Sequence, residues 1–407
     1  EGARLGMQMT GNDLNPVAWL VVKNDLTDVD IGEMNELFDH IEREVKPQIM
    51  PFYTCKGPNG EKGKWTQLST GKVMGDEFDP LALSWEERKD YEYKGAEVIY
   101  TFWAKHGPCA TRGCGHRTPL MSSPVVSVKT LSVKSWLDFE CPNCKGFFDV
   151  ELQSARMAPS SRLLVSESEK PFSIINKEGE FSCPHCHQIT KDIAAVLKGD
   201  SILLPKSLRK TKNVNLTLLV SPEWLKGCSS FDEHGRLGGT NRSCSESTSR
   251  WFDNRIQNLE LIEVRGHVDD KVIDRETGEI FSTKEATIPK KSTFTCQEET
   301  CGRQQDVLTS INASGESGAI APFAEHCMSP DYKDSSGVYG GRFFRAPDKD
   351  SIYKIKMAYA EWQERKDGDL RSCWPRTELA FGLKTTKQSI AEHGFPTYAD
   401  MFNARQL

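Results

Sequence analysis

The chain has 407 residues, of which 37% are hydrophobic and 27% are charged, and its formal net charge is −6. This composition is ordinary for a globular protein of two or three domains, and it excludes a chain that is basic throughout, so a nucleic-acid site would have to be a local basic patch. The apolar runs are too short to span a bilayer and no secretion signal leads the chain, so we expect a cytoplasmic protein without a membrane partner.

The N-terminal segment predicts the end of a helix, a short strand and a second helix. Gly6 is typical of a helix C-cap, and residues 7–12 fit a buried strand that ends at Asp13. Pro16 favours the start of the next helix, because proline is tolerated in a first turn. In a doubly wound sheet an acid at the end of the second strand reaches the ribose of a nucleoside. Asp13 is therefore a candidate ribose ligand, although aspartate before a turn is also common turn chemistry.

Residues 27–100 predict a helical connector. Apolar residues recur at helical spacing over residues 31–45, and plain core packing is the simplest explanation of that stripe. Pro47 and Pro51 predict the end of this helix. A second helix is expected over residues 84–90.

Residues 101–338 predict a β-rich region, and residues 339–407 predict a return to helical structure. Strand-like runs cover residues 96–103, 122–137, 147–152 and 215–220, with a long polar loop over residues 227–249. Residues 348–365 predict a helix with several large apolar residues.

The region from 101 to 338 holds most of the thirteen cysteines. Eight of them form four close pairs, which are Cys109/Cys114, Cys141/Cys144, Cys183/Cys186 and Cys296/Cys301. Two pairs are C-P-x-C knuckles, and the other two have four intervening residues and a following glycine that permits a tight turn. Two such pairs complete a tetrahedral four-cysteine site, so the pattern predicts about two structural zinc ions. Disulfides would instead need an oxidising compartment.

The pairing of the four knuckles is left open by their spacing. Sequence proximity favours one site from the first two pairs and another from the last two, and a swapped pairing stays possible. His185 and His187 are alternative ligands, although histidines at such positions are more often ordinary residues of the knuckle loop.

Three short basic stretches are candidate nucleic-acid contacts. They are the cluster of Lys206, Arg209, Lys210 and Lys212, the run from Arg342 to Arg345, and the group of Arg112, His116 and Arg117. A solvated loop is the simpler and favoured explanation of the first stretch, and buried phenylalanines flanked by surface arginines are the favoured explanation of the second. An ordinary structural role is favoured for the third in the same way.

Four stretches of the chain resemble a family of bacterial and archaeal adenine-specific DNA methylases that use S-adenosylmethionine. They are "EGARLGMQMTGNDLNPVAWLVVKNDL" at the start, "TFWAKHGPCATRGCGHRTPL", "FTCQEETCGRQQDVL" and the closing "GFPTYADMFNARQL". The resemblance implies an α/β fold: a partial Rossmann-like methyltransferase core over residues 1–26, joined by the connector to a large β-rich, zinc-ribbon-containing insertion. It also implies that S-adenosylmethionine contacts Asp13, Leu14, Asn15 and Pro16.

The catalytic loop of that family, Asp/Asn-Pro-Pro-Tyr/Phe, does not occur in this chain, which contains no Pro-Pro dipeptide. The glycine-rich loop that precedes the first stretch in the family is also missing. We therefore expect a fragment of a DNA adenine methyltransferase, inactive alone, with double-stranded DNA and other defence-system proteins as partners. The alternative is a non-enzymatic zinc-ribbon module that binds nucleic acid or protein.

Overall fold

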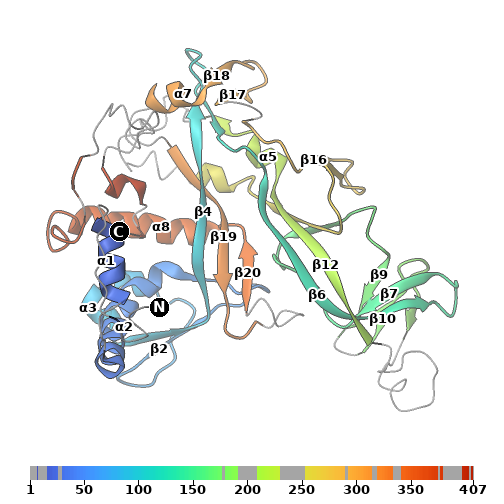
Figure 1. Ribbon diagram of the computed structural model, residues 1–407, viewed down its shortest axis with the longest axis horizontal. Coiled ribbons are helices and arrows are strands. Elements are labelled where there is room, and N and C mark those ends of the chain that lie inside the picture. The colour runs from blue at the N-terminus through green and yellow to red at the C-terminus, as the bar shows by residue number, and fades with distance from the viewer. Residues whose placement is uncertain are drawn as a thin grey trace.

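The computed structural model describes residues 7, 16–25, 30–176, 179–190, 209–229, 253–288, 292–313, 319–332, 341–374, 376–378, 397–402 and 405–406. These residues form a mixture of helices and strands around two curled six-stranded sheets (Figure 1). The two sheets share one large apolar cluster, which includes Leu131, Val214, Trp224 and Phe323.

The first sheet is antiparallel throughout and is centred on the long strand β4 (Ala96–Pro108). Its order is β13-β5-β4-β19-β20, and β1 also pairs with β4. The other members are β1 (Thr54–Cys55), β5 (His116–Pro119), β13 (Cys228–Ser229), β19 (Ala319–Met328) and β20 (Arg342–Arg345). Strands from before residue 100 and after residue 338 therefore lie in the same sheet as strands from between them.

The second sheet is built on two long antiparallel strands, β6 (Val125–Glu140) and β12 (Arg209–Val220). Its order is β8-β14-β12-β6-β7-β9, and only the β8–β14 and β7–β9 pairs among these described strands are parallel. The remaining members are β7 (Phe147–Glu151), β8 (Arg162–Val165), β9 (Phe172–Ile174) and β14 (Leu261–Arg265). Figure 1 shows β6 and β12 as a long twisted ribbon that runs from the neighbourhood of α5 to β7, β9 and β10.

Four antiparallel hairpins complete the described strands. They are β2 (Lys64–Gln67) with β3 (Tyr91–Lys94), β10 (Phe181–Ser182) with β11 (Ile189–Thr190), β15 (Lys271–Ile273) with β16 (Ile280–Ser282), and β17 (Thr293–Thr295) with β18 (Gln304–Asp306).

Several of the described helices begin at a residue whose side chain caps the first turn. Asp30 caps α2, Ser84 forms a capping box with Glu87 at α3, and Asp348 caps α8. The described α-helices are α1 (Pro16–Asp25), α2 (Ile31–Tyr53), α3 (Trp85–Arg88), α5 (Pro222–Leu225), α7 (Val307–Ala313) and α8 (Lys349–Arg365), with 3-10 turns at Pro80–Ala82 and Ala399–Met401.

Helix α2 corrects two expectations. It continues through Pro47 and Pro51 to Tyr53, so the predicted end at the prolines is wrong. Pro51 and Phe52 are buried, and the side chain of Arg88 donates to the carbonyl of Gln48. Tertiary packing therefore offsets the roughly 3 kcal/mol that an internal proline costs a helix.

The apolar stripe of α2 is the second correction, because it does not pack into the core. Phe52 at the C-terminal end lies against Leu81 and Ala358, but the stripe itself is exposed, with 68% of the Ile31 side chain and 59% of the Phe38 side chain accessible to solvent. The exposed members are Ile31, Met34, Leu37, Phe38, Ile41 and Val45.

Most of the other predicted elements are confirmed. The four predicted strand runs fall largely within β4, β6, β7 and β12, and α8 covers most of the predicted helix at 348–365. The predicted helix at 84–90 is the short helix α3, which spans only Trp85–Arg88. Helix α1 begins at Pro16, as expected. The predicted strand at 7–12, apart from Met7, and the polar loop beyond Ser229 lie outside the described residues.

Candidate metal centres

The first cysteine cluster joins two connections that are distant in sequence. Cys109 and Cys114 lie between β4 and β5, and Cys296 and Cys301 lie between β17 and β18. The Sγ atoms of Cys109 and Cys301 are 3.5 Å apart, those of Cys114 and Cys296 are 3.8 Å apart, and all four sulfurs lie within 4.8 Å of one another. We call this cluster site 1.

The second cluster has the same construction. Cys141 and Cys144 lie between β6 and β7, and Cys183 and Cys186 lie between β10 and β11. The Cys141–Cys186 and Cys144–Cys183 sulfur distances are 3.8 and 3.6 Å. We call this cluster site 2.

The sulfur distances suit a shared metal ion and not a disulfide. A disulfide bond is about 2.05 Å long, whereas four sulfurs at about 2.3 Å from a tetrahedral ion lie about 3.8 Å apart. Each cluster could therefore hold one zinc-like ion with protein sulfurs alone.

One backbone conformation recurs in all four knuckles. The residue that follows the second cysteine has a positive φ each time, at 62° for Gly115, 61° for Lys145, 59° for His187 and 58° for Gly302. In site 2 the amide of that residue donates to the carbonyl of the first cysteine, at 3.0 Å for Lys145 and 2.9 Å for His187. This left-handed turn aims both thiols of a knuckle at one point, which is why glycine follows the second cysteine in site 1.

The pairing that sequence proximity favoured is wrong. The first and last knuckles form site 1 and the two middle knuckles form site 2, so site 2 is nested inside the span of site 1. The physical reason is the first sheet, in which β4 pairs with both β5 and the distant strand β19. That pairing brings the β17–β18 hairpin, followed by α7, back to the β4–β5 connection.

The local electrostatics favour a thiolate in each cluster. A hydrogen bond from the backbone of Gln188, followed by one from the side chain of Asn143, lowers the pKa of Cys186 to about 6. The hydroxyl of Thr111 and then the backbone of Arg303 lower the pKa of Cys301 to about 6. Burial raises the pKa of Cys296 in site 1, and in site 2 burial and the neighbouring cysteines outweigh the hydrogen bond from the backbone of Gly146 and raise the pKa of Cys144 to about 12. Each metal-free cluster therefore holds one thiol that ionises readily beside others that stay protonated, and metal binding would release protons from the latter.

The nearby histidines do not belong to either ligand group. The Nε2 atom of His185 lies 3.2 Å from the carbonyl of Phe147, and His187 is exposed in the left-handed turn. His116, which follows site 1, is buried with its Nε2 2.8 Å from the carbonyl of Lys226. Four cysteines make up each group among the described residues.

The candidate basic stretches have mostly structural roles. Lys212 is enclosed by Asp149 and Glu151, each 3.0 Å from its Nζ, so it does not offer a free charge to a phosphate. Phe343 and Phe344 are buried and Arg342 is exposed, as the simpler explanation of their run expects, but Arg345 is buried and pairs with Asp348 at 2.8 Å, so it is not a surface arginine.

The remaining basic candidates differ in exposure. Lys210 and Arg112 are exposed, Arg117 is buried, and Lys206 lies outside the described residues.

The expected cofactor contacts are largely outside the described part of the chain. Asp13, Leu14 and Asn15 fall there, and Pro16 is the first residue of α1. The contacts predicted for S-adenosylmethionine therefore stay a prediction.

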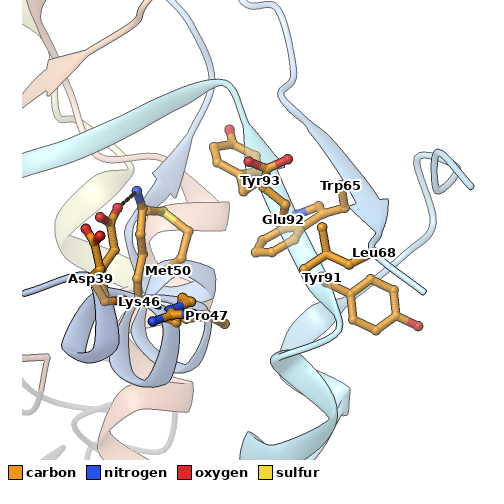
Figure 2. Close-up of a pocket in the computed structure, with 11 residues that line it drawn as sticks. Asp39, Lys46, Pro47, Met50, Trp65, Leu68, Tyr91, Glu92 and Tyr93 are labelled. Atoms are coloured by element: carbon orange, nitrogen blue, oxygen red, sulfur yellow. Dashed lines mark hydrogen bonds and ion pairs between the residues drawn. The ribbon is translucent and has the colours of Figure 1, made fainter. Parts of the chain in front are cut away.

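A cleft of about 490 Å³ lies between α2 and the β2–β3 hairpin (Figure 2). Trp65 and Tyr93 form an aromatic wall with ring centroids 5.1 Å apart, and Met50 and Pro47 of α2 lie on the other side. Sequence reasoning did not single out this cleft, because its lining comes from separate segments. The alternation of Tyr91, Glu92 and Tyr93 is the signal that could have indicated a strand with an aromatic face.

Comparisons of the chain with protein-family models, with curated proteins and with solved structures found no match. Within the described residues, no helix combines the length and the apolar character needed to cross a bilayer.

Proposed function

We propose that the chain binds two zinc ions and that both ions are structural. The observation that carries this proposal is the convergence of four cysteine sulfurs in each of two clusters. Zinc with four protein ligands has no open position for water or substrate, so its contribution is to the stability of the fold.

Metal analysis of the purified protein tests this proposal. We expect about two equivalents of zinc per chain, and about one equivalent when Cys301 or Cys186 is replaced by serine. Cys373, an exposed cysteine outside both clusters, provides the matched control, and Cys373→Ser is expected to retain both ions. A metal-free protein that folds with unchanged stability after chelation would contradict the proposal.

We further propose that the chain is part of an S-adenosylmethionine-dependent adenine-specific DNA methyltransferase of the cytoplasm, with double-stranded DNA as its partner. The support is the resemblance of four stretches that are spread over the chain from residue 1 to residue 407. In this proposal residues 1–26 contribute to a Rossmann-like cofactor core, and the zinc-ribbon-containing insertion contributes to the recognition of DNA or of a defence-system partner. Because the chain has no Asp/Asn-Pro-Pro-Tyr/Phe loop, the proposal assigns no catalytic residue to it.

Cofactor binding, and not turnover, is therefore the appropriate test of the methyltransferase proposal. Equilibrium dialysis with radiolabelled S-adenosylmethionine should detect binding that Asp13→Asn weakens, because the neutral amide loses the charge that strengthens hydrogen bonds from the ribose hydroxyls. Asp25→Asn, at the end of α1, is the control with the same change in charge. Absence of binding, or equal binding by both variants, would contradict the role of Asp13.

A non-enzymatic zinc module is the second candidate, and one observation favours it. The two sheets and both cysteine clusters are built from residues 54–345 and share an apolar core, to which α8 adds Ile352 and Ile355. A protein that holds two zinc ions and binds a macromolecule but no S-adenosylmethionine would support this candidate over the methyltransferase.

A further inference from the structure

Strand β3 has a free edge beside the cleft between α2 and the β2–β3 hairpin. One edge of β3 pairs with β2, and among the described residues no strand pairs with the other edge. In Figure 2 the labelled residues of β3 lie between those of β2 and those of α2, and residues of all three elements line the cleft. The free edge of β3 therefore borders the cleft.

The hydrogen bonds of the hairpin show which backbone groups reach this edge. The amide of Gln67 and the carbonyl of Trp65 both bond to residues 72–74 on the far side of β2, each at 2.9 Å. In an antiparallel pair, two directly opposed residues either bond to each other or both point away from the partner strand. Trp65 and Gln67 point away from β3, so the residues opposite them direct their backbone groups away from β2. These residues are Tyr93 and Tyr91.

The free edge therefore offers two amides and two carbonyls, those of Tyr91 and Tyr93. Among the described residues no backbone hydrogen bond engages these four groups on the side away from β2. An open strand edge is a template for another strand, which would lie about 4.8 Å from β3. The cleft has a volume of about 490 Å³, within the range of ligand-binding sites, so there is room for a ligand at this edge.

The two faces of β3 select different side chains on an added strand. Tyr91 and Tyr93 share one face, where the ring of Phe78 lies 4.8 Å from that of Tyr91 and the ring of Trp65 lies 5.1 Å from that of Tyr93. Glu92 is exposed and alternates to the other face. Side chains of an added strand alternate in the same way, so apolar residues would contact the aromatic face while basic residues lie on the side of Glu92.

The charges that line the cleft also favour a basic ligand. Three carboxylates and two cations line it, and Lys46, one of the two cations, already pairs with Glu42. Glu92 lies 3.4 Å from Lys94, but both groups are exposed and such a pair contributes little. The lining therefore carries one net negative charge, which a basic side chain would complement.

We propose that this cleft binds an extended peptide segment of a partner protein, which adds as a third strand to the free edge of β3. Its apolar side chains contact the aromatic face, and its basic side chains lie on the side of Glu92. Main-chain hydrogen bonds would supply affinity and the alternating side chains would supply specificity, as in other cases of strand addition. This inference goes beyond the proposed function and depends neither on zinc nor on S-adenosylmethionine.

The first experiment uses the unaltered full chain and a fluorescent, capped peptide of five residues, Lys-Val-Lys-Val-Lys, with binding followed by anisotropy. An added strand presents every other amide to β3. One peptide is N-methylated at both valines and a second at the last two lysines. We expect one of these peptides to bind about tenfold or more weakly than the parent, because it loses two main-chain hydrogen bonds, and the other to bind within about threefold of it.

Variants of the chain locate the site. Tyr91→Pro and Tyr91→Ala both remove the ring, but only proline also removes an amide of the free edge, and no bond to β2 is lost because that amide points away from it. We expect the proline variant to bind the parent peptide about tenfold more weakly than the alanine variant. Glu92→Gln should weaken binding about threefold, and Glu77→Gln, an exposed residue outside the cleft with the same change in charge, should not.

Four results would overturn the inference. The first is no binding of the parent peptide by the unaltered chain at about 1 mM. The second is an equal effect of the two N-methylation patterns, which would mean that the peptide does not pair as a strand. The third is unchanged binding when serine replaces both valines, which would leave only charge attraction. The fourth is equal binding by the proline and alanine variants, which would place the peptide elsewhere. The peptide series uses only the unaltered chain, so it decides the matter even if the proline variant fails to fold.

Discussion

A single backbone position decides whether each cysteine knuckle can form. The residue after the second cysteine is left-handed in all four knuckles, yet only site 1 has glycine there. Lysine and histidine adopt this conformation in site 2 at a cost that glycine does not incur, about 1–2 kcal/mol for a residue with a Cβ atom. The cost of this conformation can therefore be tested in two ways, by removing glycine from a knuckle of site 1 and by introducing glycine into a knuckle of site 2.

We expect Gly302→Ala to lower the free energy of unfolding by about 1 kcal/mol and Lys145→Gly to leave it unchanged or raise it slightly. A Cβ atom at Gly302 meets no atom within 4 Å, so the cost there reflects backbone conformation and not a clash. Urea denaturation of the zinc-loaded variants measures both changes. If Gly302→Ala is as stable as the unaltered protein and Lys145→Gly is less stable, the side chain of Lys145 contributes more to stability than its backbone conformation costs.

His326 makes the stability of the first sheet depend on pH. It lies in β19 with the rings of Phe344 and Tyr100 at centroid distances of 4.5 and 6.1 Å, and burial, followed by the positive charges of Arg342 and Lys129, lowers its pKa. Because the unfolded histidine has a pKa of about 6.5, the folded state binds fewer protons below that pH. The stability contributed by the neutral side chain of His326 is therefore fully present above about pH 6.5. It is lost as the pH falls from there toward the lowered pKa of His326 in the folded state.

We expect His326→Phe to reduce the loss of stability between pH 7 and pH 5.5 by about 0.5 kcal/mol, a small value because the ring is only half-buried. Phenylalanine keeps an aromatic ring in the stack and removes the titration. Part of the pH dependence should remain, because burial also lowers the pKa of the fully buried His106. Denaturation curves at both pH values, with zinc content checked at each, measure this difference. If the variant loses as much stability as the unaltered protein, His326 is not a source of the pH dependence.

Among the elements, helix α2 shows that an apolar pattern with helical period can predict a helix without predicting the burial of its apolar face. Its apolar residues follow the period of a helix, and the helix forms, but only its C-terminal end is buried, where Phe52 packs against Leu81 and Ala358. Periodicity reports which side chains share a face, whereas burial depends on what the rest of the fold places against that face. An exposed stripe of this kind contributes little to the stability of the isolated chain.

We therefore expect Leu37→Gln combined with Phe38→Gln to change the free energy of unfolding by less than about 0.5 kcal/mol, and Phe52→Ala to lower it by about 3 kcal/mol or more. The two glutamines replace side chains that are 57% and 59% exposed, whereas Phe52 is 8% exposed. Urea denaturation of the three proteins tests this contrast. A large loss for the double glutamine variant would mean that the stripe is packed in solution.

For the whole molecule, local features were predictable from sequence and long-range pairings were not. The Cys-Pro-x-Cys spacing and the glycine after Cys301 specify a knuckle because each acts within a few residues. The partner of that knuckle depends on β4 pairing with β19, which joins residues more than two hundred positions apart, and proximity along the chain carries no information about it. The same limit applies to Lys212, whose acidic partners are Asp149 and Glu151 of β7 and Glu169 of the loop between β8 and β9.

The nested arrangement of the two clusters implies that they stabilise the molecule unequally. Site 1 joins Cys109 to Cys301, 192 positions apart, whereas site 2 joins Cys141 to Cys186, 45 positions apart. A cross-link restricts the unfolded chain more when it closes a longer loop, and the difference between these spans is about 1.3 kcal/mol. Both sites use the same knuckle conformation, so their native geometries are closely matched.

We expect Cys301→Ala to lower the free energy of unfolding of the zinc-loaded protein by about 1 kcal/mol more than Cys186→Ala. Each variant should retain about one equivalent of zinc, and the remaining ion should protect the segment that it closes from limited proteolysis. Loss of site 1 should expose both the β4–β5 connection and the β17–β18 hairpin to cleavage, because the same ion holds them, whereas loss of site 2 should expose only the far end of the β6–β12 ribbon. A larger destabilisation on loss of site 2 would mean that packing around β7 and β10, and not loop closure, sets the contribution of each ion.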